Sequence, residues 1–410
     1  MDTDLHDYLA VGIGPANLSL AALAHPVPGL RGAHLERRAD FSWHPGLLLP
    51  EATLQVSQFK DLVTLADPTS PFSFLAFLAA RGRLYRFLAA DFPAVLRREF
   101  DQYFQWVAGQ LPALTFGAEV HSVDFHHGAF HARTARGEVR ARHLVLGTGL
   151  TPDIPAAFRP FTGETLFHSG EFLLHRPETA GRRVVVVGGG QSGAEIVRHL
   201  ASGPRPPRTL TWVSRRPSFL PLDDSPFAND LYTPDYVRHF HGLPPERRAG
   251  LLEGQKYTSD GIDLHVLRDI YQLAYQREFL DGDPDALRFL PSCTVTALEG
   301  DPGDWKLSLS SEDHRAPAAL AADLVVLSTG YRYQLPGFMA PLAARLRRTG
   351  EDLEVGEDFS VSWDGPPEHR IYLQNGARHA WGVADPNLSL LSWRSAVILN
   401  SLLGETRYPV

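Results

Sequence analysis

Short hydrophobic runs that end in glycine alternate along this chain with segments whose apolar residues have helical spacing. The runs DYLAVG (7–12) and VVVV (184–187) predict buried strands, because short apolar runs next to glycine are typical of sheets covered on both faces. Each run leads through glycines into a segment of small and apolar residues, at 15–25 and 191–201, that predicts a helix. The chain therefore contains two strand–glycine–helix units.

The remaining pattern predicts further elements around these two units. Strands are expected at 32–36, 143–149, 209–214 and 323–333, and helices at 70–82, 97–111 and 263–278. Proline and aromatic residues make 217–262 rich in loop signals, and the last part of the C-terminal stretch has a helical pattern. Strands that alternate with helices in this way predict an α/β fold.

Composition narrows the class of protein. The 410 residues are 44% hydrophobic and 21% charged, and none of their segments approaches 18 uninterrupted apolar residues, so we expect a globular protein without a membrane span. The acidic start MDTDLHDYLA has no basic region, so we expect no secretory signal and a cytoplasmic location. A net charge of -8 with dispersed signs argues against binding to nucleic acid or to a membrane surface.

The first glycine turn has the residues that a dinucleotide pyrophosphate requires. They are Gly12, Gly14, Pro15, Ala16 and Asn17. The glycines permit a tight turn and close approach of the backbone, and the pyrophosphate charge would lie at the helix N-terminus. Glu36, at the end of the next strand, would accept hydrogen bonds from ribose hydroxyls and repel a 2′-phosphate, which favours FAD or NAD. The alternative is a glycine turn that only packs a strand on a helix.

The second glycine turn differs from the first after its second strand. Its cofactor-binding candidates are Gly188, Gly190, Gln191 and Ser192 in the turn, followed by Arg215 and Arg216 beyond the strand. Guanidinium groups match a 2′-phosphate bidentately and would gain nothing from a plain ribose. This pattern favours NADPH, and the alternative is a solvated arginine pair at the end of a strand.

Two dinucleotide sites in one chain indicate a bound flavin and a diffusing hydride donor. The single cysteine, Cys293, excludes the cysteine pair of a disulfide reductase, so dioxygen or a small molecule takes the electrons. FAD, NADPH and dioxygen together indicate a monooxygenase. The dispersed His, Asp and Glu residues show no metal-ligand spacing, and we predict no metal.

The order of the two turns predicts a nested arrangement of two Rossmann-like domains. An FAD domain would be built from 1–165 and 325–410, with an NADPH domain, 166–324, inserted between them. Residues 217–285 would add a small helical region that lines the substrate pocket at the domain junction, where ligand pockets tend to lie.

Eight sequence blocks, in order from Tyr8 to about Leu403, resemble one family. They are GIGPANLSLAAL, FSWHPG, LQVSQFKDLVTLADPTSPFSFLAFL, VVGGGQSGAE, SPFAND, KYTSDGID, STGYR and ADPNLSLLSWRSA. Together they resemble the flavin-dependent N-hydroxylating monooxygenases of siderophore biosynthesis, with the L-lysine N6-monooxygenases as the nearest branch. The resemblance implies that NADPH reduces FAD, that dioxygen adds at the flavin C4a as a hydroperoxide, and that a neutral terminal amine is hydroxylated. Family members are often tetramers.

The resemblance also implies roles for two residues of LQVSQFKDLV. Gln55 would lie near the flavin, and Lys60 would pair with the α-carboxylate of the substrate. Putrescine and cadaverine have no such anion, and an unpaired buried lysine would be costly, so Lys60 favours L-lysine over a diamine. The alternative is a surface lysine on an exposed turn.

Two further residues bear on the substrate by resemblance. Asn229, in SPFAND, would hold the α-amino end of the substrate, or it is a turn asparagine. Ser259 belongs to TSDGI, which is similar to the lysine and diamine branches, whereas the ornithine enzymes carry an Asn-Tyr pair there. L-lysine is therefore the expected substrate, with a diamine, L-ornithine, another flavin monooxygenase reaction and an NADPH oxidase as alternatives.

The last candidates are expected around the flavin. Trp43 and His44 would pack near it, although a structural histidine would look the same in sequence. The segment Asn387, Leu388 and Ser389 would close over the isoalloxazine. Helix capping by Asp385, with proline at the first helical position, explains the same residues without a function.

Overall fold

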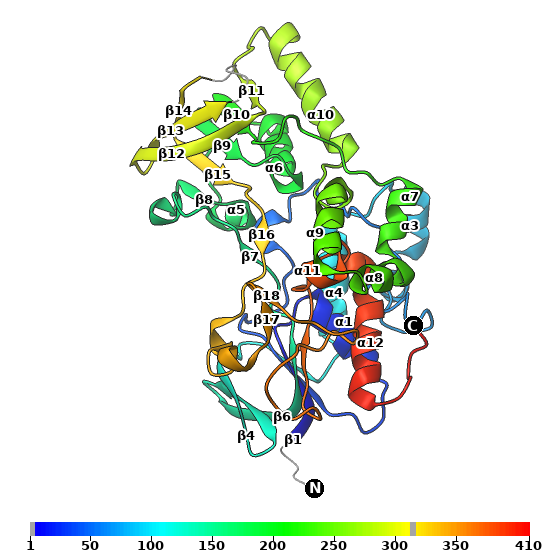
Figure 1. Ribbon diagram of the computed structural model, residues 1–410. Helices are drawn as coiled ribbons and strands as arrows, with labels where there is room; N and C mark the ends of the chain where they lie inside the picture. Colours follow the sequence, from blue (N-terminus) through cyan, green and yellow to red (C-terminus); the bar gives the residue numbers. More distant parts are fainter. Residues whose placement is uncertain (1–4, 312–316) are drawn as a thin grey trace.

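The structure is a computed structural model that describes residues 5–311 and 317–410. Two sheets organise the chain, one in the lower and one in the upper half of Figure 1. The lower sheet has the strand order β3-β2-β1-β6-β5-β4, and β19 also pairs with β6. Its strands are β1 (Leu5–Val11), β2 (Gly32–Leu35), β3 (Leu114–Thr115), β4 (Val120–His126), β5 (Ala129–Thr134), β6 (Gly137–Leu146) and β19 (Ile371–Leu373). We call this sheet and its helices the first unit.

Helices from both ends of the chain cover the first sheet. Helix α1 (Pro15–Ala24) packs against α4 (Arg97–Ala108) and α12 (Leu391–Leu403). Every residue of α1 after Pro15 is buried, which explains why the sequence there is almost wholly small or apolar. Residues near both ends of the chain thus share one hydrophobic core.

The upper sheet is parallel throughout and has the order β11-β10-β9-β15-β8. Its strands are β8 (Leu166–His168), β9 (Arg183–Val187), β10 (Thr209–Val213), β11 (Leu287–Leu290) and β15 (Leu324–Leu327). Helices α6 (Gln191–Ser202) and α10 (Leu264–Tyr275) pack together against it. An antiparallel sheet of β12 (Cys293–Asp301), β13 (Asp304–Ser311) and β14 (Ala319–Ala322) completes this second unit.

The chain passes between the units through one short antiparallel pair, β7 (Thr151–Pro152) and β16 (Tyr331–Arg332). The second unit is therefore inserted into the first. The expected boundary at 324 falls inside β15, which pairs with β8 and β9 along Leu324–Leu327, so the strands of the second unit extend through Leu327.

The expected helical region at 217–285 is present, whereas the expectation that 217–262 is rich in loops is wrong for much of its length. It contains α7 (Pro226–Asn229), α8 (Pro234–His241) and α9 (Pro245–Gly254). Each helix has its proline at the first position, where a missing N–H costs nothing, so the prolines begin helices instead of breaking them. Helices α8 and α9 pack on α11 (Arg378–Trp381) of the first unit, whereas α10 packs on α6.

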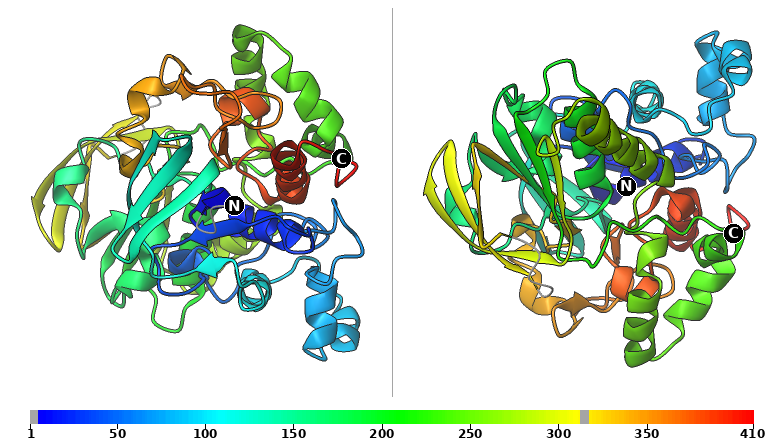
Figure 2. Two further views of the ribbon diagram at one scale, coloured as in Figure 1. Left: turned by 90° about the horizontal axis from the view of Figure 1, so that it is seen from below. Right: turned by 90° about the horizontal axis from the view of Figure 1, so that it is seen from above.

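The predicted helix at 70–82 is shorter in the structure and a second helix follows it. Helix α2 (Phe74–Ala80) buries three apolar side chains, but α3 (Leu84–Ala90) buries none and stands away from the body of the molecule (Figure 2, light blue). Among the described residues, we find no helix with the length and hydropathy needed to cross a membrane.

Candidate functional site

The first glycine turn joins β1 to α1 in a geometry that leaves room for a phosphate. Gly12 has φ +88°, and a Cβ there would lie 2.7 Å from the carbonyl oxygen of Gly147. Gly14 is the N-cap of α1 with no side chain as a cap, and no atom lies within 4 Å of where its Cβ would be. The first amides of α1, after Pro15, therefore face open space beside a helix N-terminus, which fits a pyrophosphate.

Two polar side chains brace this turn. Glu36 is buried after β2, and its carboxylate accepts hydrogen bonds from the Ile13 amide (2.8 Å) and the Arg38 amide (3.0 Å). Asn17 donates to the Gly12 carbonyl (2.7 Å) and accepts from Gln374 (2.8 Å). The carboxylate of Glu36 thus lies at the turn, while the amide of Asn17 is occupied by the protein itself.

The second glycine turn repeats this backbone geometry between β9 and α6. Gly188 has φ +128°, and a Cβ there would lie 2.0 Å from the carbonyl oxygen of Ser328. Gly190 is the uncapped N-cap of α6, again with no atom within 4 Å of its Cβ position. Gln191 and Ser192 form the first helical turn, so their amides are available to a second pyrophosphate.

The two arginines beyond β10 have different surroundings. Arg216 is half-buried and donates to the carbonyl oxygens of Gly189 (3.0 Å) and Asp260 (2.8 Å). Arg215 is exposed and makes no side-chain hydrogen bond or ion pair with the described part of the chain. Arg216 therefore holds the glycine turn, and Arg215 is the guanidinium left to meet a ligand.

Lys60 lies where the N-terminal and C-terminal parts of the first unit meet. It contacts only neutral groups. Its ammonium donates to the hydroxyl of Ser389 (3.1 Å) and sits 5.6 Å from the centre of the Tyr232 ring. Ser389 in turn donates to the side-chain oxygen of Asn387 (2.8 Å). Within the described residues, Lys60 has no carboxylate partner, and its partial burial lowers the pKa of the ammonium. Such a cation attracts an anionic ligand.

The segment 257–260 holds the aromatic ring that lies beside Lys60. The hydroxyl of Tyr232 donates to the Thr258 carbonyl, which ties the ring below Lys60 to this segment. Ser259 donates to Asp260 (2.8 Å) and accepts from Arg378 (3.0 Å), the first residue of α11. Sequence reasoning missed Tyr232, whose only signal was its position just after the SPFAND block.

Asn229 is three residues before Tyr232, but its side chain hydrogen-bonds within its own turn. Its amide donates to the carbonyls of Asp224 (2.9 Å) and Ser225 (3.2 Å) and its side chain is exposed. A role in substrate binding remains a prediction that would need a different rotamer.

Residues 43–55 precede Lys60 in the chain, and Leu47, Leu49 and Ala52 of this segment pack into the core of the second unit. The amide of Trp43 donates to Asp101 (2.9 Å), and its ring packs edge-on against Phe104 (5.3 Å). His44 has a left-handed backbone and is exposed, although neighbouring protein atoms crowd its ring. This crowding, together with Arg97 and Arg38 nearby, lowers the pKa of His44 to about 4, so it is neutral at physiological pH.

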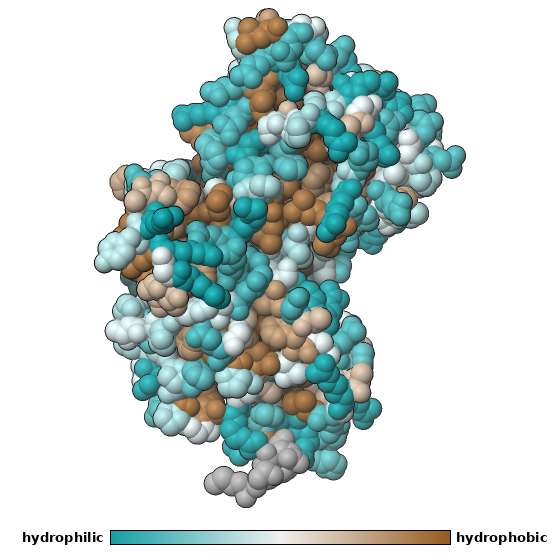
Figure 3. Space-filling model, turned by 180° about the vertical axis from the view of Figure 1, so that it is seen from behind, coloured by the Kyte–Doolittle hydropathy of each residue, from teal (hydrophilic) through white to brown (hydrophobic). Residues whose placement is uncertain are grey.

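Gln55 and the 387–389 segment complete the set of predicted residues. Gln55 is exposed in the segment that runs between the units. Asn387 is the N-cap of a short 3-10 turn, with its side chain bound to the Ser389 amide (2.8 Å), and Leu388 is partly buried beside it. Seen from behind, hydrophobic residues gather in a band across the middle of the molecule, where the two units meet (Figure 3). The structure describes no cluster of metal-ligating residues.

Two nested sheets, each with an uncapped glycine turn, define a flavoprotein of the two-dinucleotide class. Comparison with known proteins identifies the family, since residues 4–333 match L-lysine 6-monooxygenase/L-ornithine 5-monooxygenase. An L-lysine N6-monooxygenase from Escherichia coli is 39% identical over 403 residues, which cover 97% of this chain and 95% of that protein. The chain belongs to this family.

Two solved structures have the same fold over almost their whole length. A cadaverine monooxygenase from Erwinia amylovora, bound to FAD, has 32% identity and a TM-score of 0.92, over 99% of this chain and 96% of that one. An ornithine N-hydroxylase from Kutzneria sp. 744, with reduced FAD, NADP+ and L-ornithine, has 33% identity and a TM-score of 0.90, over 98% and 99%. This protein is a flavin-dependent N-monooxygenase of siderophore biosynthesis, and its cofactors are FAD and NADPH.

Proposed function

We propose that this enzyme hydroxylates the terminal amine of L-lysine, giving N6-hydroxylysine for a hydroxamate siderophore. The observation that carries the proposal is Lys60, a partly buried ammonium whose partners are a hydroxyl and an aromatic ring. An α-carboxylate would supply the missing counter-charge. Cadaverine is the same chain without that anion and would leave Lys60 unpaired, which is costly for a desolvated charge.

The two glycine turns would divide the cofactors between them. Gly12, Gly14 and Glu36 would hold FAD, because the carboxylate accepts hydrogen bonds from ribose hydroxyls and repels a 2′-phosphate. Gly188, Gly190 and Arg215 would hold NADPH, whose 2′-phosphate matches an unpaired guanidinium. FAD reduced by NADPH supplies the oxygen-transfer chemistry that side chains lack.

The chain's own residues would bind the substrate and set its orientation. Lys60 would fix the α-carboxylate and so set the orientation of the rest of the substrate. The terminal amine must be uncharged to react, although its pKa in water is about 10.4. Surroundings that exclude water would favour the neutral form and would also limit leakage of oxidant.

A diamine is the second candidate substrate, because one of the most similar structures is a cadaverine monooxygenase. L-ornithine is the third, since the family includes ornithine enzymes. Oxidation of NADPH without amine hydroxylation is a more distant alternative. Lysine is favoured by Lys60 and by the 39% identity to an L-lysine N6-monooxygenase.

The test compares L-lysine with cadaverine in the wild type and in Lys60→Ala. We expect the wild type to prefer lysine, and the variant to have a KM for lysine that is roughly ten- to a thousand-fold higher. Flavin reduction by NADPH should stay near normal. Cadaverine turnover should be unharmed or improved, because the unpaired cation is gone. Hydroxylamine product is measured with each amine.

Lys306→Ala is the matched control, because Lys306 is an exposed lysine on β13, in the small antiparallel sheet of the second unit. It should leave both amines unaffected. A wild-type enzyme that prefers cadaverine or putrescine would overturn the lysine proposal in favour of the diamine. L-ornithine, run beside lysine, tests the length of the side chain that the pocket accepts.

A further inference from the structure

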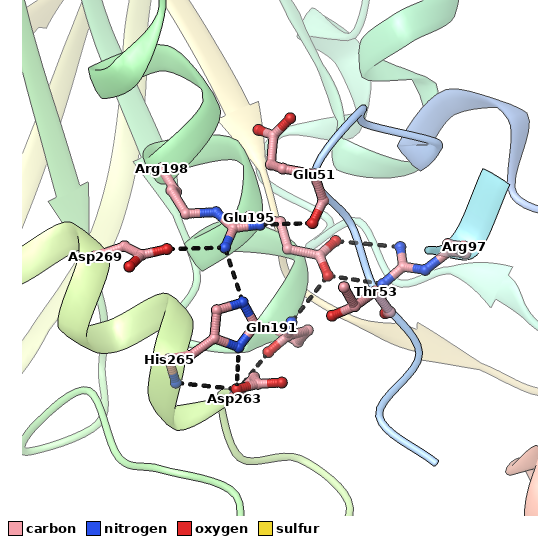
Figure 4. Close-up of polar contacts among 9 residues, drawn as sticks. All are labelled: Glu51, Thr53, Arg97, Gln191, Glu195, Arg198, Asp263, His265 and Asp269. Atoms are coloured by element: carbon pink, nitrogen blue, oxygen red, sulfur yellow. Dashed lines mark hydrogen bonds and ion pairs between the residues drawn. The ribbon is translucent and has the colours of Figure 1, made fainter. Parts of the chain in front are cut away.

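One face of α6 binds the first unit directly. Gln191, Glu195, Arg198 and His199 are spaced by four, three and one residues, which places them on the same side of a helix. Figure 4 shows Gln191, Glu195 and Arg198 directed toward Arg97, the 51–53 segment and α10. The helix that begins at the second glycine turn is therefore also the helix that meets the first unit.

A bidentate ion pair lies at the centre of this contact. Arg97, the first residue of α4, donates to both carboxylate oxygens of Glu195, at 2.7 and 3.2 Å. It also donates to the carbonyls of Leu47 (3.3 Å) and Thr53 (3.4 Å), in a segment whose Leu47, Leu49 and Ala52 pack into the core of the second unit. The side chains of Arg97 and Glu195 are only 12% and 2% exposed, so water screens the pair little. A fork-to-fork contact of this kind fixes both distance and orientation.

Glu195 passes this constraint on to the glycine turn. It accepts a hydrogen bond from Gln191 (2.9 Å), the residue that follows the three glycines. The side-chain oxygen of Gln191 accepts from the amide of Asp263 (2.8 Å), the N-cap of α10. A continuous polar chain thus runs from α4 of the first unit to the turn that would hold the nicotinamide nucleotide (Figure 4).

A second tie on the same face keeps α6 from rotating about the ion pair. Arg198, which is buried, donates to the Glu51 carbonyl (3.0 Å) and pairs with Asp269 of α10 (3.1 Å). His199 lies 3.0 Å from the Glu51 carboxylate. Arg198 and His199, in the second half of α6, therefore hold the segment that leads to Gln55 and Lys60.

We propose that Arg97 and Glu195 are positioning residues for flavin reduction, and that their ion pair sets the distance between the two nucleotide-binding turns. The proposal rests on the NADPH-to-FAD reaction of this family and on nothing about the amine, so it stands or falls separately from the lysine assignment. Displacement of about 1 Å at a reacting centre can cost on the order of a hundred-fold in rate. The loss of an ion pair that fixes the distance between the units should therefore change the rate of flavin reduction.

The first test uses Glu195→Gln and the milder Glu195→Asp, both purified with FAD. Reduction by NADPH under anaerobic conditions should slow by at least tenfold at saturating NADPH, while the Kd for NADP+ changes by less than threefold. Reduction by dithionite, which does not need the second unit, should match the wild type. Glu99→Gln is the matched control. Glu99 lies on α4 like Arg97, and its partner Arg83, whose side chain is 43% exposed, belongs to the first unit.

The second test separates positioning from stability by removing both charges. Arg97→Met and Glu195→Met should each lower the midpoint of thermal unfolding of the apoprotein, because each leaves one buried charge unpaired. The double variant should recover most of that midpoint, since two apolar side chains replace a buried pair. Its rate of reduction by NADPH should stay as low as in either single variant.

Three results would overturn the proposal. Normal reduction by NADPH in Glu195→Gln would show that the pair does not position the turn. If the double variant recovers both the rate of flavin reduction and the unfolding midpoint, the ion pair only stabilises the protein. Rate losses that add up in the double variant would show that Arg97 and Glu195 act independently.

Discussion

The two glycine turns share one backbone arrangement and differ in the charged residues that follow the next strand. In both, the first glycine packs against a carbonyl at the end of a neighbouring strand, Gly12 against Gly147 and Gly188 against Ser328. In both, the N-cap glycine faces open space and the helix has no side-chain cap. Phosphate binding is thus a property of the main chain, and it can be repeated within one protein.

The difference lies in the charge at the end of the next strand. Glu36 accepts a hydrogen bond from an amide of its own turn, whereas Arg216 donates to a carbonyl of its turn. The backbone of a glycine turn presents both N–H donors and C=O acceptors. A carboxylate or a guanidinium can therefore brace it. In the first turn one carboxylate would brace the turn and read the ribose. In the second turn two arginines divide these tasks. Arg216 binds the backbone of the turn, and Arg215, which has no partner within the described chain, would bind the phosphate.

The largest effect should come from adding a methyl group to either first glycine. Gly12→Ala should yield protein that loses FAD, and Gly188→Ala should keep FAD but lose reduction by NADPH. Each adds backbone strain of about 1–3 kcal/mol and an overlap with a carbonyl, so we expect roughly hundred-fold weaker binding or more. FAD absorbance and anaerobic reduction are the measurements. Gly250→Ala, in α9 with open space around it, is the control. Loss of both cofactors from each variant would show that the turns are not separable.

An intermediate effect should separate the two arginines. Arg215→Ala should weaken NADPH by about 1.5–3 kcal/mol, roughly ten- to a hundred-fold, and leave NADH almost unchanged, because it removes only a contact to the 2′-phosphate. Arg216→Ala should weaken both nucleotides, because it loses its bonds to Gly189 and Asp260. Kd values for NADPH and NADH give the answer. Equal losses in Arg215→Ala would remove its role in reading the phosphate.

The smallest effect should come from Glu36→Gln, which keeps an acceptor but removes the charge. Hydrogen bonds to a charged group exceed neutral ones by about 1 kcal/mol, so FAD should bind roughly five-fold more weakly. Fluorescence titration of the apoprotein with FAD measures this. Glu36→Arg should go further and give colourless protein. A fully flavinated Glu36→Arg would contradict the ribose assignment.

The sequence was informative wherever local chemistry decides the structure. The strand and helix of each glycine turn appear within a few residues of their predicted places, because glycine, proline and apolar runs act locally. The same local reasoning failed for α8 and α9, whose prolines were interpreted as loop signals. Proline marks a loop or a helix start, and only the packing of those helices on α11 separates the two.

Contacts between distant residues could not be predicted. Arg97 and Glu195 are far apart in sequence, and each alone looks like an ordinary charged residue of an amphipathic helix. Only a carboxylate in the otherwise small-residue block GGGQSGAE could have drawn attention to Glu195. The ring of Tyr232 beneath Lys60 is similar, because its position depends on the 257–260 segment that holds its hydroxyl.

The insertion of one unit into the other also sets the order in which the two units can fold during translation. Strand β19 and helix α12 are translated after the whole second unit, yet β19 completes the first sheet and α12 packs on α1. Domains generally fold as they emerge from the ribosome. The second unit begins later in the sequence but is complete earlier, so it should fold first. Nascent chains halted before Ile371 should already protect the second sheet from protease, while stable uptake of FAD should wait until Leu403 has left the exit tunnel.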